Sequence, residues 1–402
     1  MKIIIHWLLT GLIVTCVSGA DWPQFRGPGG NSLAIDAQLP VAWDDQGDVN
    51  IAWRIDLPGR GPSCPIIVGD RVLLTATSGY REERLHVMCY DANSGDQRWH
   101  RQLWATGRTA THDSITGAAP TPASDGHYVY AFYSSNDLVC LDLEGNLRWY
   151  RGLSYDYPKA GNDVGMASSP VIVNGVVVVQ VENKSDSFAA GIDAATGETR
   201  WRIRRLADSN WASPIVVPGT GGRKTAVVLQ SGDRLTAHDP QTGEELWRFD
   251  ESCATIASSV FADNVLFAPM NGLTALRFSN ESNAVDIAWD SNRLRPGSAS
   301  PVVDNGRVFV LSNATVRCGD AETGELIWAV RLKGRHWATP VLAGGRLYCI
   351  NEDGDVRVVA VGEEQGRIVG ESSFGEKIHA SPAVANGAMY VRSDKHLWKI
   401  AE

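Results

Sequence analysis

The residues of this chain that could do chemistry lie between strand-forming repeats, and most are histidines, tryptophans and arginines. If they converge on one pocket, such side chains would bind an acidic or aromatic ligand through stacking, cation–π contacts and charge. The structural alternative is that they are solvated loop residues, with the tryptophans packing over inner strands. The candidates are His112, Asp163, Asn210, Trp211, Arg295, Arg335, His336, Trp337 and His379.

No established catalytic motif accompanies these candidates. The chain lacks a His-x-x-x-His pair, a Cys-x-x-Cys pair, a Gly-x-Ser-x-Gly turn and a phosphate-binding loop. His112, His336 and His379 come from separate loops, so a metal site would require them to meet across the axis of the fold. We therefore expect no catalytic residue and no metal.

A repeated phrase indicates the elements that position these loops. A polar turn from Asp to Gly is followed four residues later by Trp at residues 91–99, 193–201, 239–247 and 320–328. Self-similarity at about 40–50 residues is typical of a repeat architecture. A repeated phrase of this kind describes a scaffold rather than an active site.

A second phrase sets the number of repeats. A small residue, often next to Pro, precedes an apolar run, a Gly or Asn turn and a β-branched run. Each repeat has room for four antiparallel strands, and the sequence therefore predicts an all-β, eight-bladed β-propeller. The eight copies begin at Ser63, Pro120, Ser169, Ser213, Ser258, Ser300, Thr339 and Ser381.

The eighth repeat is divided between the two ends of the chain. Residues 381–400 supply three strands without a following Trp strand, and residues 50–59 supply a lone Trp strand. Joining them closes the ring and leaves no open blade edge. We expect residues 21–49 to form an N-terminal extension and residues 50–402 to form the propeller.

The repeated tryptophans are expected to dock neighbouring blades. A Trp on an outer strand can fill the gap between blades and donate its indole N–H to a backbone carbonyl. The Asp of each turn would bond to the turn backbone, and the Gly would adopt a positive φ. Calcium binding by these Asp residues is the alternative. The docking residues are Trp53, Trp99, Trp149, Trp201, Trp247, Trp289 and Trp328, with Gly370 in the seventh repeat.

The first residues read as an export signal, predicted to span residues 1–20. Lys2 precedes a mostly apolar run, and Ser18-Gly-Ala20 offers a cleavage site. Lipid attachment through Cys16 is an alternative that Thr15 disfavours.

The net charge of −9 argues against binding nucleic acid or anionic membranes. No second apolar stretch is long enough to span a bilayer, so we expect an exported protein of the periplasm or cell envelope.

The remaining cysteines read mostly as small buried hydrophobes, although an even number in an oxidising compartment is compatible with disulfides. Equivalent positions in different blades would lie too far apart to bridge. A bridge from Cys64 stays open. The six residues are Cys64, Cys89, Cys140, Cys253, Cys318 and Cys349.

Both phrases resemble the repeats of the pyrroloquinoline-quinone-like (PQQ-like) propeller superfamily, which includes BamB-like assembly lipoproteins and quinoprotein alcohol dehydrogenases. The segment Asp21-Trp-Pro-Gln-Phe-Arg-Gly-Pro-Gly29 resembles the mature N-terminus of exported propellers of planctomycete-type bacteria. The resemblance to the dehydrogenases implies PQQ and calcium on the axis, often beside two adjacent cysteines. This chain has no such cysteine pair and few long insertions.

The resemblance favours a non-enzymatic scaffold of the cell envelope that binds a protein partner, with no cofactor. One alternative is a PQQ-dependent dehydrogenase of alcohols or sugars that uses calcium. A further alternative is a propeller that binds a glycan or small ligand through Trp211 and Trp337. Fold alone does not decide between these functions.

Overall fold

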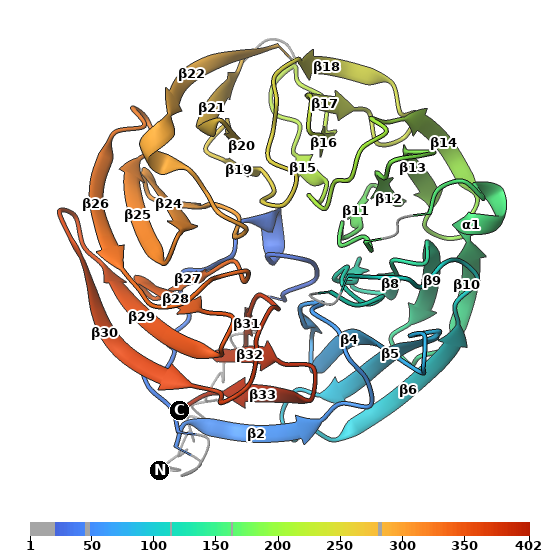
Figure 1. The fold of residues 1–402 in the computed structure, drawn as a ribbon, viewed down its shortest axis with the longest axis horizontal. Helices are drawn as coiled ribbons and strands as arrows, with labels where there is room; N and C mark the ends of the chain where they lie inside the picture. The colour runs from blue at the N-terminus through green and yellow to red at the C-terminus, as the bar shows by residue number, and fades with distance from the viewer. Residues whose placement is uncertain (1–20, 45–48, 113–114, 162–163, 280–283) are drawn as a thin grey trace, which may run out of the picture.

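The computed structural model describes residues 21–44, 49–112, 115–161, 164–279 and 284–402. Its strands form eight radially arranged sheets around a central axis (Figure 1), which confirms the predicted eight-bladed β-propeller. Helix is limited to α1 (Leu153–Asp156) and the 3-10 turns η1 (Pro28–Gly30) and η2 (Asn292–Leu294) in the described residues. The signal predicted for residues 1–20 lies outside them.

The first four blades each run from an innermost to an outermost strand. They are β3 (Ile66–Val68), β4 (Arg71–Ser78), β5 (Arg84–Asp91) and β6 (Gln97–Trp104); β7 (Ala123–Ser124), β8 (Tyr128–Phe132), β9 (Asp137–Asp142) and β10 (Leu147–Gly152); β11 (Val171–Val173), β12 (Val176–Val181), β13 (Phe188–Asp193) and β14 (Thr199–Arg204); and β15 (Ile215–Val217), β16 (Ala226–Gln230), β17 (Leu235–His238) and β18 (Glu245–Phe249).

The next three blades follow the same order, and the eighth is completed by the other end of the chain. They are β19 (Val260–Ala262), β20 (Val265–Met270), β21 (Gly272–Phe278) and β22 (Val285–Ser291); β23 (Val302–Asp304), β24 (Arg307–Ser312), β25 (Thr315–Asp320) and β26 (Leu326–Arg331); β27 (Val341–Ala343), β28 (Arg346–Ile350), β29 (Asp355–Val361) and β30 (Gly366–Ser373); and β31 (Ala383–Ala385), β32 (Ala388–Arg392) and β33 (His396–Ile400), with β2 (Ile51–Asp56).

The ring closes as predicted, because β2 pairs antiparallel with β33 from the C-terminus. Ile51 lies opposite Ile400, and Asp56 lies opposite His396.

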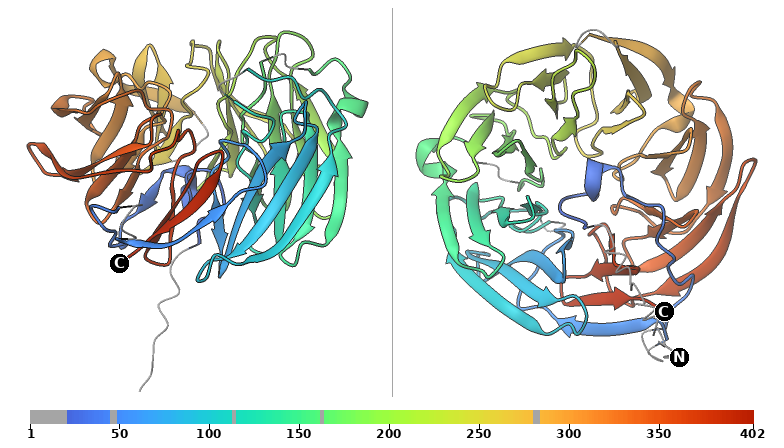
Figure 2. Two further views of the ribbon diagram at one scale, coloured as in Figure 1. Left: turned by 60° about the horizontal axis from the view of Figure 1, so that its bottom comes forward. Right: turned by 180° about the vertical axis from the view of Figure 1, so that it is seen from behind.

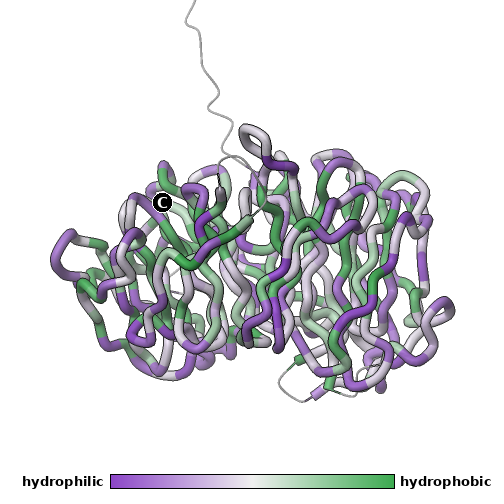
Figure 3. Tube along the Cα trace, turned by 90° about the horizontal axis from the view of Figure 1, so that it is seen from above, coloured by the Kyte–Doolittle hydropathy of each residue, from purple (hydrophilic) through white to green (hydrophobic). Residues whose placement is uncertain are grey.

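The connections from each outer strand to the next inner strand lie on one side of the disc, which we call the mouth face. Seen edge-on, hydrophobic stretches follow the strands and hydrophilic ones occupy many loops (Figure 3).

The outer-strand tryptophans join neighbouring blades. Trp201 is 7% exposed and donates its Nε1–H to the carbonyl of Pro240 in the next blade at 2.9 Å. A Cβ at Gly243, whose φ is +74°, would lie 2.8 Å from the Trp201 ring, so this turn requires Gly. Five further indoles donate to the adjacent blade in the same way, those of Trp53, Trp99, Trp149, Trp289 and Trp328. Trp247 packs edge-on against Phe278.

The Asp residues of the repeated turns bind backbone and arginine. Asp193 accepts the N–H groups of Ala195 and Thr196, each at 2.9 Å. The hydrogen bond from Arg200 lowers the pKa of Asp193 to about 2. No group of three His, Cys, Asp or Glu side chains that could hold a metal occurs in the described chain. The six cysteines within that chain are buried and free, so the bridge from Cys64 that the sequence left open is not formed.

The N-terminal segment, residues 21–44, closes the face opposite the mouth (Figure 2). Trp22 pairs with Ile67 of the first blade, and Arg26 donates to the Ser259 carbonyl of the fifth at 2.8 Å. The segment then adds β1 (Leu33–Ala34), which pairs parallel with β27. It therefore connects the centre of the ring to the seventh blade.

The same segment fills the position where the seventh repeat has Gly370 instead of Trp. A Cβ at Gly370 would collide with the Val41 carbonyl. The Trp43 backbone N–H donates to Ser372 Oγ at 2.9 Å, and its ring lies 5.4 Å from that of Phe374. A tryptophan from the N-terminal segment thus packs where the repeat lacks its own.

No helix in the described chain is long and apolar enough to cross a membrane.

Candidate functional site

A ring of hydroxyl side chains surrounds the axis, and its members occupy one equivalent position in every blade. Each lies two residues before an innermost strand, and Cys64 occupies the position in the first blade. We call these residues the hydroxyl ring: Cys64, Thr121, Ser169, Ser213, Ser258, Ser300, Thr339 and Ser381.

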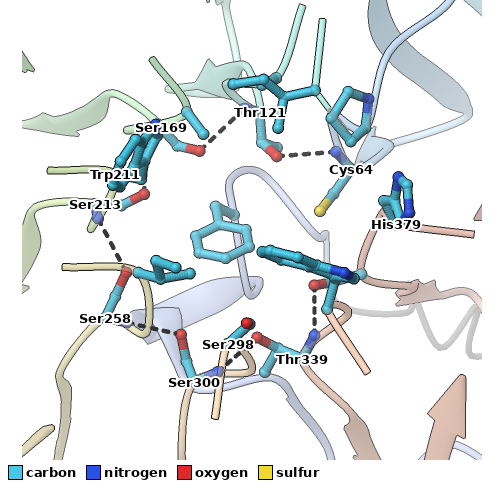
Figure 4. A pocket seen from close by; sticks show the side chains of 18 of the residues that line it. Cys64, Thr121, Ser169, Trp211, Ser213, Ser258, Ser298, Ser300, Thr339 and His379 are labelled. Atoms are coloured by element: carbon cyan, nitrogen blue, oxygen red, sulfur yellow. Dashed lines mark hydrogen bonds between the residues drawn. The ribbon is translucent and has the colours of Figure 1, made fainter. Parts of the chain in front are cut away.

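Hydrogen bonds connect the members of the hydroxyl ring from blade to blade (Figure 4). The Thr121 backbone N–H donates to Ser169 Oγ at 3.0 Å, and the Ser169 N–H donates to Ser213 Oγ at 2.9 Å. The same bond repeats at every later junction as far as Ser381. At the junction of first and last blades, burial raises the pKa of the Cys64 thiol, while hydrogen bonds with Thr121 and Ser381 oppose that rise.

Away from Cys64, five hydroxyls of the ring have no hydrogen-bond acceptor among the described residues, those of Ser169, Ser213, Ser258, Ser300 and Thr339. Each Ser or Thr hydroxyl accepts one backbone N–H, which leaves its own O–H to donate. Five hydroxyl donors without an acceptor therefore surround the axis. A ligand or water that accepts hydrogen bonds would satisfy them.

The hydroxyl ring lines a cavity of about 380 Å³ that we call the axial chamber. Phe25 of the N-terminal segment closes it on the side away from the mouth. Trp211 and Trp337 lie in its wall, and Val164 and Ile256 are partly exposed there. No Asp, Glu, Lys or Arg occurs among the described lining residues, and the described chamber wall is largely apolar.

Polar contacts hold the two tryptophans of the chamber in place. Trp211 Nε1 donates to the Gly165 carbonyl at 3.0 Å, and Trp337 Nε1 donates to Glu352 Oε2 at 3.3 Å. His379 packs edge-on against Trp337, with ring centroids 6.3 Å apart, and lies 3.7 Å from the Glu352 carboxylate. Because the N–H groups are bound, each indole presents its apolar ring to the chamber.

Four of the predicted ligand-binding residues line the axial chamber: His112, Trp211, Trp337 and His379. Asn210 is buried and donates to the Gln230 carbonyl at 2.7 Å, which orders the loop instead. Arg295 bonds to Asn271 at 2.6 Å. Neither lines the chamber.

The three remaining predicted residues are placed differently. Arg335 is exposed, with its guanidinium 6.0 Å from the Trp337 ring centre. His336 is half-buried outside the chamber lining, and desolvation lowers its pKa to about 4. Asp163 lies outside the described residues.

The hydroxyl ring was not predicted from the sequence, although a Ser or Thr recurs at its position in seven of the eight repeats. The Ser or Thr before Pro was read as part of a strand-forming phrase. That the same position faces the axis in every blade follows only from the closed ring.

Comparison with known proteins gives a family match over most of the chain. The family model described as outer membrane protein assembly factor BamB matches residues 29–202, 185–285 and 280–369. The BamB protein of Burkholderia pseudomallei is 26% identical over 366 residues, which cover 86% of this chain and 85% of that protein.

Solved structures show the same fold at low sequence identity. The crystal structure of BamB from Moraxella catarrhalis has a TM-score of 0.65 at 18% identity, and covers 88% of this chain and 97% of its own. Quinohemoprotein alcohol dehydrogenase from Comamonas testosteroni has a TM-score of 0.71 at 13% identity, with coverages of 94% and 80%. At these identities the likeness concerns fold alone.

Proposed function

The chain belongs to the family of outer membrane protein assembly factor BamB, and on this premise we propose that it is a non-enzymatic scaffold that binds a protein partner in the cell envelope. The observation that carries the proposal is the family match over nearly the whole propeller, with a BamB relative matched along 85% of its length. An exported, envelope location is part of the same proposal.

The mouth face supplies aromatic groups suited to a protein contact. Tyr80, in the turn between β4 and β5, is 97% exposed, and Trp104 at the end of β6 is 59% exposed. Tyr155 of α1, in the second blade, is 77% exposed. Exposed aromatics on neighbouring blades are typical of residues that contribute most of the energy at protein interfaces.

Site-specific photo-crosslinking tests this proposal. A photoreactive amino acid at Tyr80 or Trp104 should give a discrete adduct with an envelope protein in intact cells. Ile35, which is 57% exposed on the opposite face, is the matched control position. Adducts of equal yield from Ile35, or none from the mouth face, would count against a scaffold that works through this face.

The described chamber residues do not fit PQQ with calcium. The quinone carries three carboxylates, and calcium requires several oxygen ligands, commonly carboxylates. The described chamber lining offers hydroxyls and apolar rings but no carboxylate for the metal, and the two carboxylates of the adjoining pocket, Glu352 and Asp394, are engaged by Trp337 and Arg60. We therefore propose no dehydrogenase activity. Saturable binding of PQQ with calcium, measured by calorimetric titration of the folded protein, would overturn this proposal.

The convergence of Trp211, Trp337, His112 and His379 supports a second function, the binding of a small ligand or glycan in the axial chamber. Aromatic rings stack on ligand faces, and hydroxyls with unused protons serve acceptor groups. Malto- and chito-oligosaccharides should then quench tryptophan fluorescence in the wild type. A Trp211→Ala/Trp337→Ala variant should lose the effect, and an unchanged wild-type spectrum would argue against a glycan.

A further inference from the structure

A second cavity of about 350 Å³ adjoins the axial chamber, and we call it the side pocket. The two cavities share Pro62, His112, Ile115 and His379 in their linings. A ligand on the mouth side could therefore occupy both.

The side pocket is lined by an arginine whose hydrogen-bonding capacity is not used up. Arg392 on β32 is 0% exposed. Its Nε donates to the Ser393 carbonyl at 3.0 Å, and its Nη1 donates to the Thr75 carbonyl at 2.7 Å and Ser63 Oγ at 3.2 Å. Nη2 is buried and has no partner in the described chain. Both of its N–H groups remain to be satisfied.

The charge of Arg392 is not balanced by an ion pair in the described residues. Asp394 is engaged by Arg60 and by the Gly61 N–H, each at 3.1 Å. Glu352 binds the Trp337 indole and lies beside His379.

A second cation lines the same pocket. Lys377 is exposed and has no ion pair among the described side chains. Burying a guanidinium without an ion pair is unfavourable, and the attraction of Asp394 opposes the desolvation of Arg392 only in part. An anion in the side pocket would offset the remaining cost.

The two cavities together select a ligand with two unlike parts. The described chamber wall is largely apolar and aromatic, whereas the side pocket offers Arg392 and Lys377. Two acids, Glu352 and Asp394, also line the side pocket and would repel a dianionic phosphate more than a singly charged carboxylate.

We propose that the chamber and side pocket together bind an aromatic carboxylate, with the carboxylate against Arg392 and the ring beside Trp211 and Trp337. The inference rests on the second proposed function, that the chamber binds a ligand. The same chemistry is offered by a free aromatic acid and by the C-terminus of a protein that ends in an aromatic residue.

Calorimetric titration of the full mature chain with a matched pair of probes tests the carboxylate. N-acetyl-tryptophan should bind saturably, and N-acetyl-tryptophanamide should bind at least about tenfold more weakly, because the amide cannot form a charge-assisted bond. Equal affinities would overturn the inference and leave the chamber function standing. No binding of either probe would overturn the inference, whereas the chamber function is overturned only if the oligosaccharides also leave the tryptophan fluorescence unchanged.

Variants keep the test independent of folding. Lys377→Gln changes an exposed side chain, and it should weaken binding of the acid but not of the amide. Lys224→Gln, an exposed lysine beyond the side pocket, is the matched control and should change neither. A Lys377→Gln variant with unchanged affinity for the acid would contradict the placement of the carboxylate.

Peptide probes identify the source of the ligand. A pentapeptide that ends in tryptophan with a free carboxylate should bind as tightly as N-acetyl-tryptophan if the ligand is a protein C-terminus. Binding of the free acid without the peptide would assign the site to a small aromatic acid. Binding of the peptide amide as tightly as the peptide acid would overturn the inference.

Discussion

Replacing Trp201 with alanine should open the interface between the third and fourth blades. The side chain is 7% exposed, packs on the turn at Gly243 and donates to the Pro240 carbonyl at 2.9 Å. Burial of about 200 Å² at about 25 cal/mol per Å² gives roughly 5 kcal/mol as an upper bound. Residual burial in the unfolded chain reduces this to about 3–4 kcal/mol.

Thermal unfolding measures this loss. An unfolding entropy of about 2.1 cal/mol/K per residue, over 402 residues, makes a loss of about 4 kcal/mol a fall of roughly 5 °C in Tm. Trp104→Ala is the matched control, because Trp104 is 59% exposed, and its Tm should stay within about 1 °C of the wild type. A Trp201→Ala variant as stable as the control would refute the docking argument.

Two further perturbations test buried polar groups. Glu182→Ala should destabilise the protein by about 3–5 kcal/mol in urea unfolding, because it strands the buried Arg205, 2.8 Å away. Adding Arg205→Met should recover part of the lost free energy of unfolding. If the effects of the two substitutions simply add, Glu182 and Arg205 do not interact as argued. Burial and the neighbouring His100 lower the pKa of His86 to about 4, below its unfolded value near 6.5. The contribution of His86 to the free energy of unfolding is therefore fully present above about pH 6.5. It is lost as the pH falls toward 4, because the unfolded state binds the proton at a higher pH than the folded state does. His86→Gln should flatten the pH dependence of the urea midpoint in that window, and an unchanged slope would exclude His86 as its source.

The repeats could be predicted because their signals are local. An Asp turn, a Gly with positive φ and a Trp four residues later mark each outer hairpin wherever it lies in the chain. The split eighth blade followed from counting these signals, and the register of Ile51 with Ile400 confirms it.

Features that depend on distant contacts could not be predicted in this way. The sequence showed that Gly370 interrupts the Trp series but not that Val41 and Trp43 pack there. Likewise, His336 and Trp337 are adjacent in sequence, yet only Trp337 lines the chamber. Which neighbour faces the axis is decided by the loop conformation, which carries no simple periodicity.

The side pocket was missed for a related reason. Arg392 lies in a strand that reads as ordinary core, and a charged residue there is expected to have a partner. Its unused Nη2 becomes visible only when the surrounding acids are found bound to other groups.

The closure of the ring by β2 and β33 also fixes a time order for folding. β2 leaves the ribosome, or any transport channel, before the other blades, and its partner β33 emerges after them. The first strand must therefore remain unpaired while the other blades are delivered one after another. A chain threaded from its N-terminus cannot complete its native ring until β33 has emerged, so the ring closes on the side of the channel that receives β33.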